Sequence, residues 1–124
     1  MVARNADKAA SLVELGDKLG VQARWVALGE RLNSLGVVVN TLPADVAGEF
    51  SGTVAGTAVL LDAIYDPWPT PIAASAGDRV LVSGLDLLAH QAVLQFELFT
   101  GVPGPLDVMR SAGEAELAAR HASG

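Results

Sequence analysis

The chain has 124 residues, enough for one compact domain, and 51% of them are hydrophobic, which can support a sizeable core. Its net charge of −6 argues against nonspecific nucleic-acid binding, which needs clustered Lys and Arg, and the absence of cysteine excludes disulfides and thiolate catalysis. No apolar run approaches the ~20 residues of a membrane span and no apolar signal core follows the N-terminus, so we expect a cytoplasmic protein that contacts no membrane.

The first predicted element is a helix. Residues 6–19 carry Ala, Leu and Val at helical spacing, with Asn5 placed to cap the start and Gly20 placed to stop the end. Gly16 lies inside this segment and lowers its intrinsic helix propensity slightly.

Four short apolar runs follow the pattern of strands. They are flanked by Gly, Asp or Asn, and they occupy residues 23–28, 37–39, 58–61 and 80–82. Near-continuous apolarity, in place of strict alternation, is typical of strands buried on both faces of a parallel sheet, so we expect helices to cover the sheet. Thr70-Pro71 predicts the start of one short helix, with the hydroxyl as cap and Pro in the first position.

The clearest helix spans residues 83–101. Ser83 followed three residues later by Asp86 resembles a capping box, and Gly101 suits the left-handed residue that ends many helices. One apolar face should be buried, and it consists of Leu85, Leu88, Ala92, Phe96 and Phe99.

A second line on the same helix indicates a ligand face. Gly84, Leu87 and Gln91 follow helical spacing, so a bare backbone, an apolar side chain and an amide point the same way. We place Gln91 on the inner side of the helix, where its amide needs hydrogen-bond partners. His90 is interpreted as a solvated partner of Asp86, one turn away.

Pro105 predicts the start of a last helix over residues 105–120. Its inward-facing stripe should consist of Leu106, Met109, Gly113 and Leu117, and the tail from His121 onward should fray. Two distant histidines and no cysteine do not make a metal site, so none is predicted. No serine elbow or paired-acid signature predicts a catalytic residue in this chain.

Three motifs, in order, carry a family resemblance over nearly the whole chain. They are residues 38–43 (a strand and an Asn-x-x-Pro turn), residues 62–72 (Asp-x-x-Tyr-x-Pro-x-x-Thr-Pro-Ile) and the helix 83–101. Together they resemble the C-terminal, NADP-binding part of shikimate dehydrogenases, including the quinate/shikimate-type relatives. The resemblance implies reversible hydride transfer between NADPH and the C3 carbonyl of 3-dehydroshikimate, giving shikimate for aromatic amino acid biosynthesis.

The same resemblance exposes an absence. The family's N-terminal substrate domain, with its catalytic Lys and Asp, has no counterpart here, and neither has the Gly-rich turn. The expected fold is therefore an α/β, incomplete Rossmann-like, doubly wound parallel sheet with flanking helices, in which residues 1–124 form one partial dinucleotide-binding domain that lacks the first strand.

The missing strand is expected to affect stability. In the doubly wound order 3-2-1-4-5-6, strand one is central, and Met1, Val2 and Ala3 are interpreted as the end of strand two. The remaining strands then either pair directly or leave unpaired edges, and buried unpaired backbone groups cost about 1–3 kcal/mol each. We therefore expect marginal stability or dimerisation, with a split-enzyme partner as an alternative.

The resemblance also implies site residues. Arg4, helped by Asn5 and Lys8, falls where the family binds the 2′-phosphate of NADP, and NAD stays an alternative because Ala3 and Asn5 depart from the family pattern. By themselves these residues are ordinary surface groups. The positions expected to line the rest of the cofactor site are Asn40, Thr41, Ala63, Gly84 and Leu87.

Two further residues are expected to contact the substrate. Tyr65 offers a phenolic hydroxyl and Gln91 an amide to shikimate or 3-dehydroshikimate. Their plainer interpretations are half-buried packing for Tyr65 and a helix-packing hydrogen bond for Gln91, and Asn40-Thr41 is also ordinary turn chemistry.

The functional expectation is a C-terminal piece of a shikimate-dehydrogenase-like oxidoreductase that is inert alone, because the proton-transferring residues belong to the absent domain. Two alternatives stay open. One is a noncatalytic nucleotide or metabolite binder, and the other is a remnant that docks on another subunit.

Overall fold

A computed structural model describes residues 1–32, 36–54 and 56–122 of the chain. These residues form two compact units, Met1–Leu32 (unit 1) and Asn33–Gly124 (unit 2). Within the described residues, no helix has both the length and the apolar character needed to cross a bilayer.

Unit 1 contains two very short strands and one helix. They are β1 (Val2–Ala3), α1 (Ala6–Lys18) and β2 (Val26–Ala27), and the two strands are parallel. As predicted, the Asn5 side chain caps α1, accepting a hydrogen bond from the Lys8 N–H at 3.1 Å. The strand expected over 23–28 is shorter than predicted, and just before it the Trp25 indole donates to the Ala3 carbonyl at 2.9 Å.

Unit 2 is built on a three-stranded parallel sheet with the order β3-β4-β5. Its elements are β3 (Val37–Asn40), α2 (Ala44–Gly48), a 3-10 turn (Ser51–Val54), β4 (Val59–Asp62), α3 (Pro71–Ala74), β5 (Val80–Ser83), α4 (Gly84–Thr100) and α5 (Leu106–Ala122). The strand register aligns Asn40, Asp62 and Ser83 in one row at the carboxyl end of the sheet. All three strands and the Thr70-capped helix α3 were predicted; α2 and the 3-10 turn were not.

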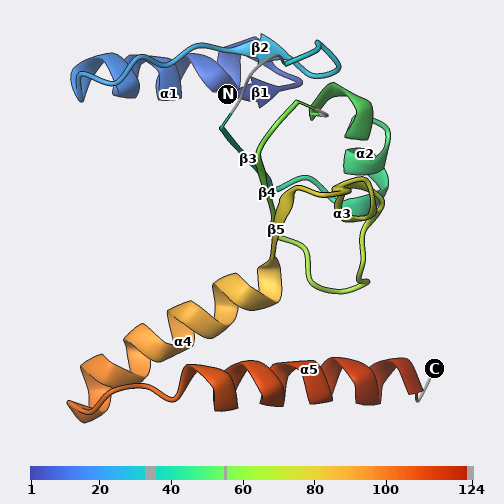
Figure 1. Cartoon of the computed structure of the whole chain (residues 1–124). Helices are drawn as coiled ribbons and strands as arrows, with labels where there is room; N and C mark the ends of the chain where they lie inside the picture. The colour runs from blue at the N-terminus through green and yellow to red at the C-terminus, as the bar shows by residue number, and fades with distance from the viewer. Residues whose placement is uncertain (33–35, 55, 123–124) are drawn as a thin grey trace. The chain divides into compact units, whose positions relative to one another are not determined.

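One face of the sheet in unit 2 is covered. Helices α2 and α3 lie on this face (Figure 1), and Leu60 at its centre is fully buried. The core of unit 2 is completed by small residues and by Ile72, which α3 directs inward.

In the described residues of unit 2, the opposite face of the same sheet is largely exposed. Alternation along each strand places six apolar side chains on it: Val37, Val39, Val59, Leu61, Val80 and Val82. Val37, Val39 and Val80 are 59%, 59% and 61% exposed. In the part of the chain that the structure describes, β3 pairs only with β4, so its other edge is unpaired. Unpaired edges were one of the two expected outcomes, and direct pairing of the remaining strands was the other.

Helices α4 and α5 pack against each other (Figure 1). The capping box of Ser83 and Asp86 and the left-handed Gly101 (φ 71°) are as predicted. Two glycines allow the helices to approach closely: Gly104, just before α5, lies against Val93, and Gly113, within α5, lies against Leu85. A Cβ added to Gly113 would lie 2.6 Å from the Leu85 side chain.

The predicted buried face of α4 is wrong in part. Ala89 is buried, whereas Leu88 and Phe99 are 42% and 86% exposed, because contact with α5 selects a different line of the helix. Each residue of the stripe predicted to face inward on α5 is half-buried: Leu106, Met109, Gly113 and Leu117. The helix also continues to Ala122, past the expected end at residue 120.

Candidate functional site

The carboxyl edge of the β3-β4-β5 sheet brings together most of the candidate residues of unit 2. Asn40 ends β3, Asp62 ends β4 just before Ala63, and Ser83 ends β5 just before Gly84. In open parallel sheets this edge is where ligands bind. The strand register therefore creates the site, because it brings the three strand ends to one level.

Buried hydrogen bonds hold the first two strand ends together. Asp62 is fully buried, and its Oδ1 accepts from the Asn40 Nδ2 at 2.9 Å and from the Ile64 N–H at 3.2 Å. Its Oδ2 accepts from the Thr70 hydroxyl, and the same hydroxyl oxygen accepts from the Ala73 N–H, which caps α3. The carboxylate is thus satisfied inside the protein, and it ties β3, β4 and α3 into one piece.

Both polar atoms of the Asn40 side chain take part in hydrogen bonds within the protein. Besides the bond to Asp62, its Oδ1 accepts from the Leu42 N–H at 3.1 Å, which closes the turn after β3. The next residue, Thr41, is exposed. The turn therefore presents Thr41 to solvent while Asn40 faces inward.

Gly84 is required by the backbone around it. A Cβ at this position would lie 2.1 Å from the Ala63 carbonyl oxygen and 3.1 Å from the Ile64 carbonyl carbon. The Gly84 N–H also donates to the Ile64 carbonyl at 3.4 Å. The start of α4 consequently lies directly against the segment that follows β4, and only glycine permits that approach.

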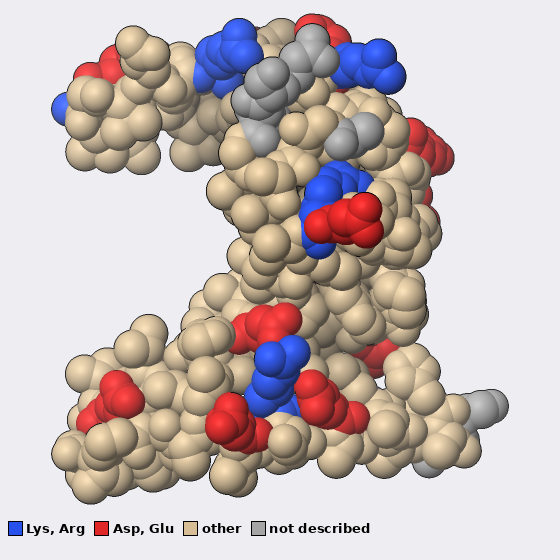
Figure 2. Space-filling view, viewed as in Figure 1, with Lys and Arg blue, Asp and Glu red and all other residues tan. Residues whose placement is uncertain are grey.

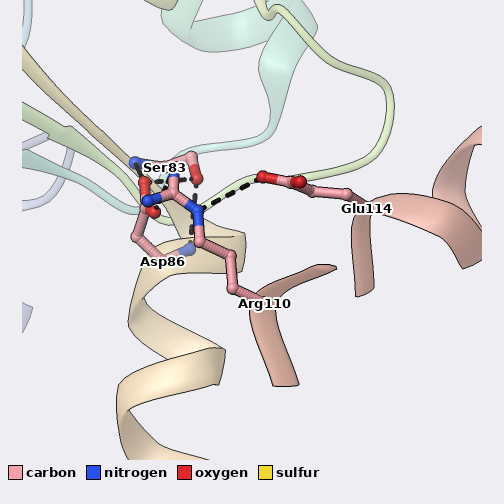
Figure 3. Close-up of polar contacts among 4 residues, drawn as sticks. All are labelled: Ser83, Asp86, Arg110 and Glu114. Atoms are coloured by element: carbon pink, nitrogen blue, oxygen red, sulfur yellow. Dashed lines mark hydrogen bonds and ion pairs between the residues drawn. The ribbon is translucent and has the colours of Figure 1, made fainter. Parts of the chain in front are cut away.

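Asp86 joins the start of α4 to α5. Its Oδ2 accepts from the Ser83 N–H at 3.0 Å and from the Ser83 hydroxyl at 2.8 Å, while its Oδ1 pairs with the Arg110 Nη2 at 2.9 Å (Figure 3). The Arg110 Nε also pairs with the Glu114 Oε1, one turn further along α5, at 3.2 Å. Acidic and basic side chains accordingly gather over α4 and α5 in Figure 2.

The surroundings of Asp86 lower the pKa of its carboxyl below the ordinary value. Partial burial acts in the opposite direction, but it is outweighed by the hydrogen bonds from Ser83 and by the charges of Arg110 and His90. His90, the partner expected for Asp86, thus acts on its carboxyl, and the direct ion pair is made by Arg110, which lies 24 positions along the chain.

Tyr65 lies at a cavity of about 380 Å³ next to this node. The lining residues are Tyr65, Trp68, Leu81, Ser83, Leu85, Asp86, Arg110, Glu114, Leu117 and His121. At its rim, the His121 Nε2 lies 3.7 Å from the Asp66 Oδ1, so the end of α5 is in contact with the segment after β4 instead of frayed.

A second hollow, of about 500 Å³, shares three of these residues, Leu81, Asp86 and Arg110. It is lined in addition by Leu61, Val82, Leu87 and His90. Leu87 therefore borders a cavity. Because Asp86 and Arg110 line both hollows, their ion pair forms part of each wall.

Gln91 is exposed, in contrast to the inner position expected for it. It does not line the cavity of Tyr65, and among the described residues its amide has no hydrogen-bond partner. Within the described part of unit 2, nothing covers this side of α4. The structure thus leaves the Gln91 amide available and does not bring it together with Tyr65.

The three cofactor candidates of unit 1 lie at the start of α1: Arg4 and Asn5 just precede the helix, and Lys8 is in its first turn. Arg4, Asn5 and Lys8 are all exposed, and no ion pair involves Arg4 or Lys8 in the described residues. The side-chain oxygen of Asn5 accepts the hydrogen bond that caps α1, so it is already engaged. A free guanidinium beside a helix N-terminus is suited to a phosphate group.

Sequence reasoning missed the buried Asp62–Thr70 pair and the Arg110 node. The buried Asp62–Thr70 pair could have been predicted, because an acidic residue at the end of an apolar strand indicates a buried carboxylate that needs partners. Nothing in the sequence indicates that Arg110 pairs with Asp86. Among residues 1–32, 36–54 and 56–122, no three His, Asp or Glu side chains are grouped so that they could hold a metal ion.

The chain is similar to the C-terminal part of known shikimate dehydrogenases. A family model described as "Shikimate 5'-dehydrogenase C-terminal domain" matches residues 84–112. The NADP(+) shikimate dehydrogenase of Methanocella arvoryzae is 34% identical over 122 residues, which are 91% of this chain and 44% of the relative.

Two crystal structures are similar as well. Shikimate dehydrogenase of Mycobacterium tuberculosis is 52% identical, with a TM-score of 0.79 over 95% of this chain and 45% of that one. A shikimate 5-dehydrogenase from Mycobacterium fortuitum is 41% identical, with a TM-score of 0.81 over 90% and 44%. The chain therefore spans less than half the length of the relatives it matches.

Proposed function

Because the chain belongs to the shikimate dehydrogenase family, whose C-terminal part it matches, we propose that it supplies the NADP-binding half of an NADP-dependent shikimate dehydrogenase. Residues 1–124 are then a partial dinucleotide-binding domain acting in the cytoplasm. The observation that carries the proposal is the carboxyl edge of unit 2, where Tyr65, Gly84 and Leu87 lie at or beside cavities at the start of α4.

Each unit, taken by itself, carries residues whose chemistry suits a part of the cofactor. In unit 1, the unpaired guanidinium of Arg4 suits the 2′-phosphate of the adenosine, with Lys8 and the free amide nitrogen of Asn5 as lesser partners. In unit 2, considered separately, Thr41, Ala63, Gly84 and Leu87 are the residues that we assign to the cofactor. Asn40 contributes by holding the turn that presents Thr41, since its side chain is engaged inside the protein.

The bound cofactor supplies the hydride, and the protein supplies position. We assign the Tyr65 hydroxyl and the Gln91 amide to the hydroxyl groups of shikimate. Tyr65 is held at a partly polar cavity, whereas Gln91 stands exposed on α4 one turn past Leu87. The two side chains act together only when further polypeptide closes over this face of α4.

The proton-transferring residues are expected from the part of the enzyme that this chain does not match. No lysine lines the cavity of Tyr65, and the Arg110 guanidinium there is already paired with two carboxylates. The chain alone should therefore not oxidise shikimate.

A chimera tests the proposal. The part of the Mycobacterium tuberculosis enzyme that precedes the matched region is fused to this chain, and NADP-dependent oxidation of shikimate is followed by absorbance. We expect turnover by the chimera and none by the chain alone. In the folded chimera, Tyr65→Phe and Gln91→Ala should each raise KM or lower kcat, whereas Gln95→Ala, which changes an exposed amide one helical turn further on, should do neither. A folded chimera without turnover contradicts the proposal.

A further inference from the structure

The loop of residues 63–69, between β4 and α3, carries Tyr65 (the Tyr65 loop). We propose that His121, in the last turn of α5, is a positioning residue for Tyr65. Its contact with Asp66 holds the tip of the loop, and loss of the imidazole proton releases the tip, so that substrate binding weakens as the pH rises. The proposal rests on the proposed function, because the assignment of Tyr65 to the substrate makes its position matter for turnover.

Hydrogen bonds fix the base of the Tyr65 loop. Asp62 and Thr70, which flank it, are fully buried and are bonded to each other. The Ile64 N–H donates to Asp62 at 3.2 Å, and the Ile64 carbonyl accepts from the Gly84 N–H at 3.4 Å. The loop therefore begins and ends at fixed points on the carboxyl edge of the sheet.

The tip of the loop has no such support. In the described part of the chain, residues 65–69 make no hydrogen bond through backbone or side chain. The one ion pair that reaches them joins the Asp66 Oδ1 to the His121 Nε2, at 3.7 Å. Because Tyr65 directly precedes Asp66, its position depends on this contact and on the packing of the side chains around it.

Helix α5 directs His121 to the cavity that Tyr65 lines. Arg110, Glu114, Leu117 and His121 follow one another at intervals of four, three and four residues, so they form one stripe of the helix. All four line the cavity of about 380 Å³ together with Tyr65. The register of the helix therefore brings the imidazole to the wall that Tyr65 shares.

The proton on the imidazole decides how strong the contact is. At 3.7 Å the two atoms are too far apart for a good hydrogen bond, so an uncharged imidazole gains little from Asp66. A protonated imidazole forms an ion pair with the carboxylate. Histidine is the side chain that ordinarily changes charge between about pH 5 and about pH 8, and His121 is 54% exposed to solvent protons. The ion pair is therefore present at the acidic end of this range and lost as the pH rises.

Arg120 is a second cation near the tip, but it does not switch. Glu116 raises the pKa of Arg120 above its ordinary value, through a hydrogen bond at 3.0 Å and its charge, with smaller contributions from Asp66 and Tyr65. The guanidinium is thus within electrostatic reach of the tip, and it stays charged throughout the range in which histidine titrates.

The other charged groups on the cavity wall are engaged with one another. Asp86 pairs with Arg110 at 2.9 Å, and Arg110 pairs with Glu114 at 3.2 Å. Among the described residues that line this cavity, His121 is the one imidazole. The other histidine of the chain, His90, lines the second hollow beside Leu87 and offers an internal comparison.

The first test uses the 124-residue chain alone and needs no activity. Because the chain has one tyrosine and two histidines, the ring signals of Tyr65 are identified directly and the two imidazoles are followed separately by NMR. Relaxation of ¹⁵N gives the order parameter of the Tyr65 amide between about pH 5 and about pH 8. We expect this order parameter to fall with the midpoint of the His121 titration, from about 0.85 towards about 0.6.

Two variants remove the contact from either side. His121→Gln and Asp66→Asn should each leave the Tyr65 amide at the low order parameter throughout the pH range. The matched controls are His90→Gln and Asp78→Asn, which change an imidazole and a carboxylate outside the cavity of Tyr65 and should keep the parental profile. Urea midpoints measured in parallel show that the variants remain folded.

The second test measures the KM for shikimate in the chimera, with NADP saturating. The KM should rise about two- to fivefold between about pH 6 and about pH 8, as expected for the loss of one partly exposed ion pair. The His121→Gln chimera should already have the higher KM at the lower pH. In a Tyr65→Phe background, His121→Gln should have little further effect, because a positioning residue acts through Tyr65.

Three results would overturn the inference. They are a Tyr65 order parameter that stays constant through the His121 titration, a His90→Gln variant that abolishes the change as His121→Gln does, and an active chimera whose KM follows the parental pH profile despite His121→Gln. A folded chimera without turnover contradicts the proposed function instead. In that case the order parameter of Tyr65 in the chain alone still decides whether His121 holds the loop.

Discussion

Asp86 at the first turn of α4 and Arg110 on α5 form a 2.9 Å ion pair, although 24 positions separate them in the chain. The same carboxylate is the reciprocal partner of Ser83 in the capping box. One side chain thus sets the start of α4 and the position of α5, next to the cavity that Tyr65 lines.

Replacing Arg110 with Ala should lower the free energy of unfolding by up to about 1 kcal/mol, since the pair is partly exposed but connects two helices. Arg120→Ala is the matched control. It removes an exposed pair with Glu116 inside one helix, at 3.0 Å, and should lower the free energy of unfolding less than Arg110→Ala does. Urea unfolding measures both, and an Arg120 effect larger than the Arg110 effect would show that the inter-helix contact contributes nothing.

Stability should fall as the pH is lowered through the acidic range. The folded environment lowers the pKa of Asp86 below its ordinary value of 3.8, so its carboxylate stabilises the fold above that value. This contribution is lost as the pH falls through the lowered pKa. Asp86→Asn should be less stable than the parent at pH 7, and the difference should shrink below about pH 4. Asp78→Asn, at an exposed carboxylate outside the node, serves as control, and a gap for Asp86→Asn that stays constant with pH would contradict the prediction.

Thr70→Val should destabilise the chain by about 1–3 kcal/mol. The change keeps the shape but removes the hydroxyl that caps α3 and donates to the buried Asp62, leaving a carboxylate oxygen without its partner. Thr100→Val removes an exposed hydroxyl bonded to the Phe96 carbonyl at 2.7 Å, and it should cost clearly less. The comparison is made by thermal and urea unfolding, and equal effects would mean that the buried network is not a source of stability.

Gly84→Ala should cost about 3 kcal/mol or more, because the new Cβ would lie 2.1 Å from a backbone oxygen that cannot move without shifting β4 or α4. Gly52→Ala offers a control at a glycine with open space around it, where the substitution should be neutral or slightly stabilising. Circular dichroism melts distinguish the two variants. A Gly84→Ala protein as stable as the parent would show that this close approach is not required.

Local signals in the sequence predicted much of this fold. The Ser83–Asp86 box, the Thr70-Pro71 start and Gly101 each act through neighbouring backbone groups, so their outcome is determined within a few residues. The half-buried stripe of α5 followed from helical spacing alone.

Features that depend on distant partners were not predictable in the same way. Ala89 is buried and Phe99 exposed because α5 selects which line of α4 is covered. Gln91 was expected inside because it shares a helical line with Gly84 and Leu87, but in the described residues it is exposed. The exposure of Val37, Val39 and Val80 was unpredictable for the same reason. The sequence of these strands is typical of burial on both faces, but within the described residues of unit 2 helices cover only one face of the sheet.

The most direct test of the central claim is NADP-dependent oxidation of shikimate, measured for the chain alone and for the chimera that joins it to the N-terminal part of the Mycobacterium tuberculosis enzyme. The account predicts background rates for the 124-residue chain and clear turnover for the chimera. Turnover by the chain alone, or a folded chimera that binds NADP and does not oxidise shikimate, would contradict it.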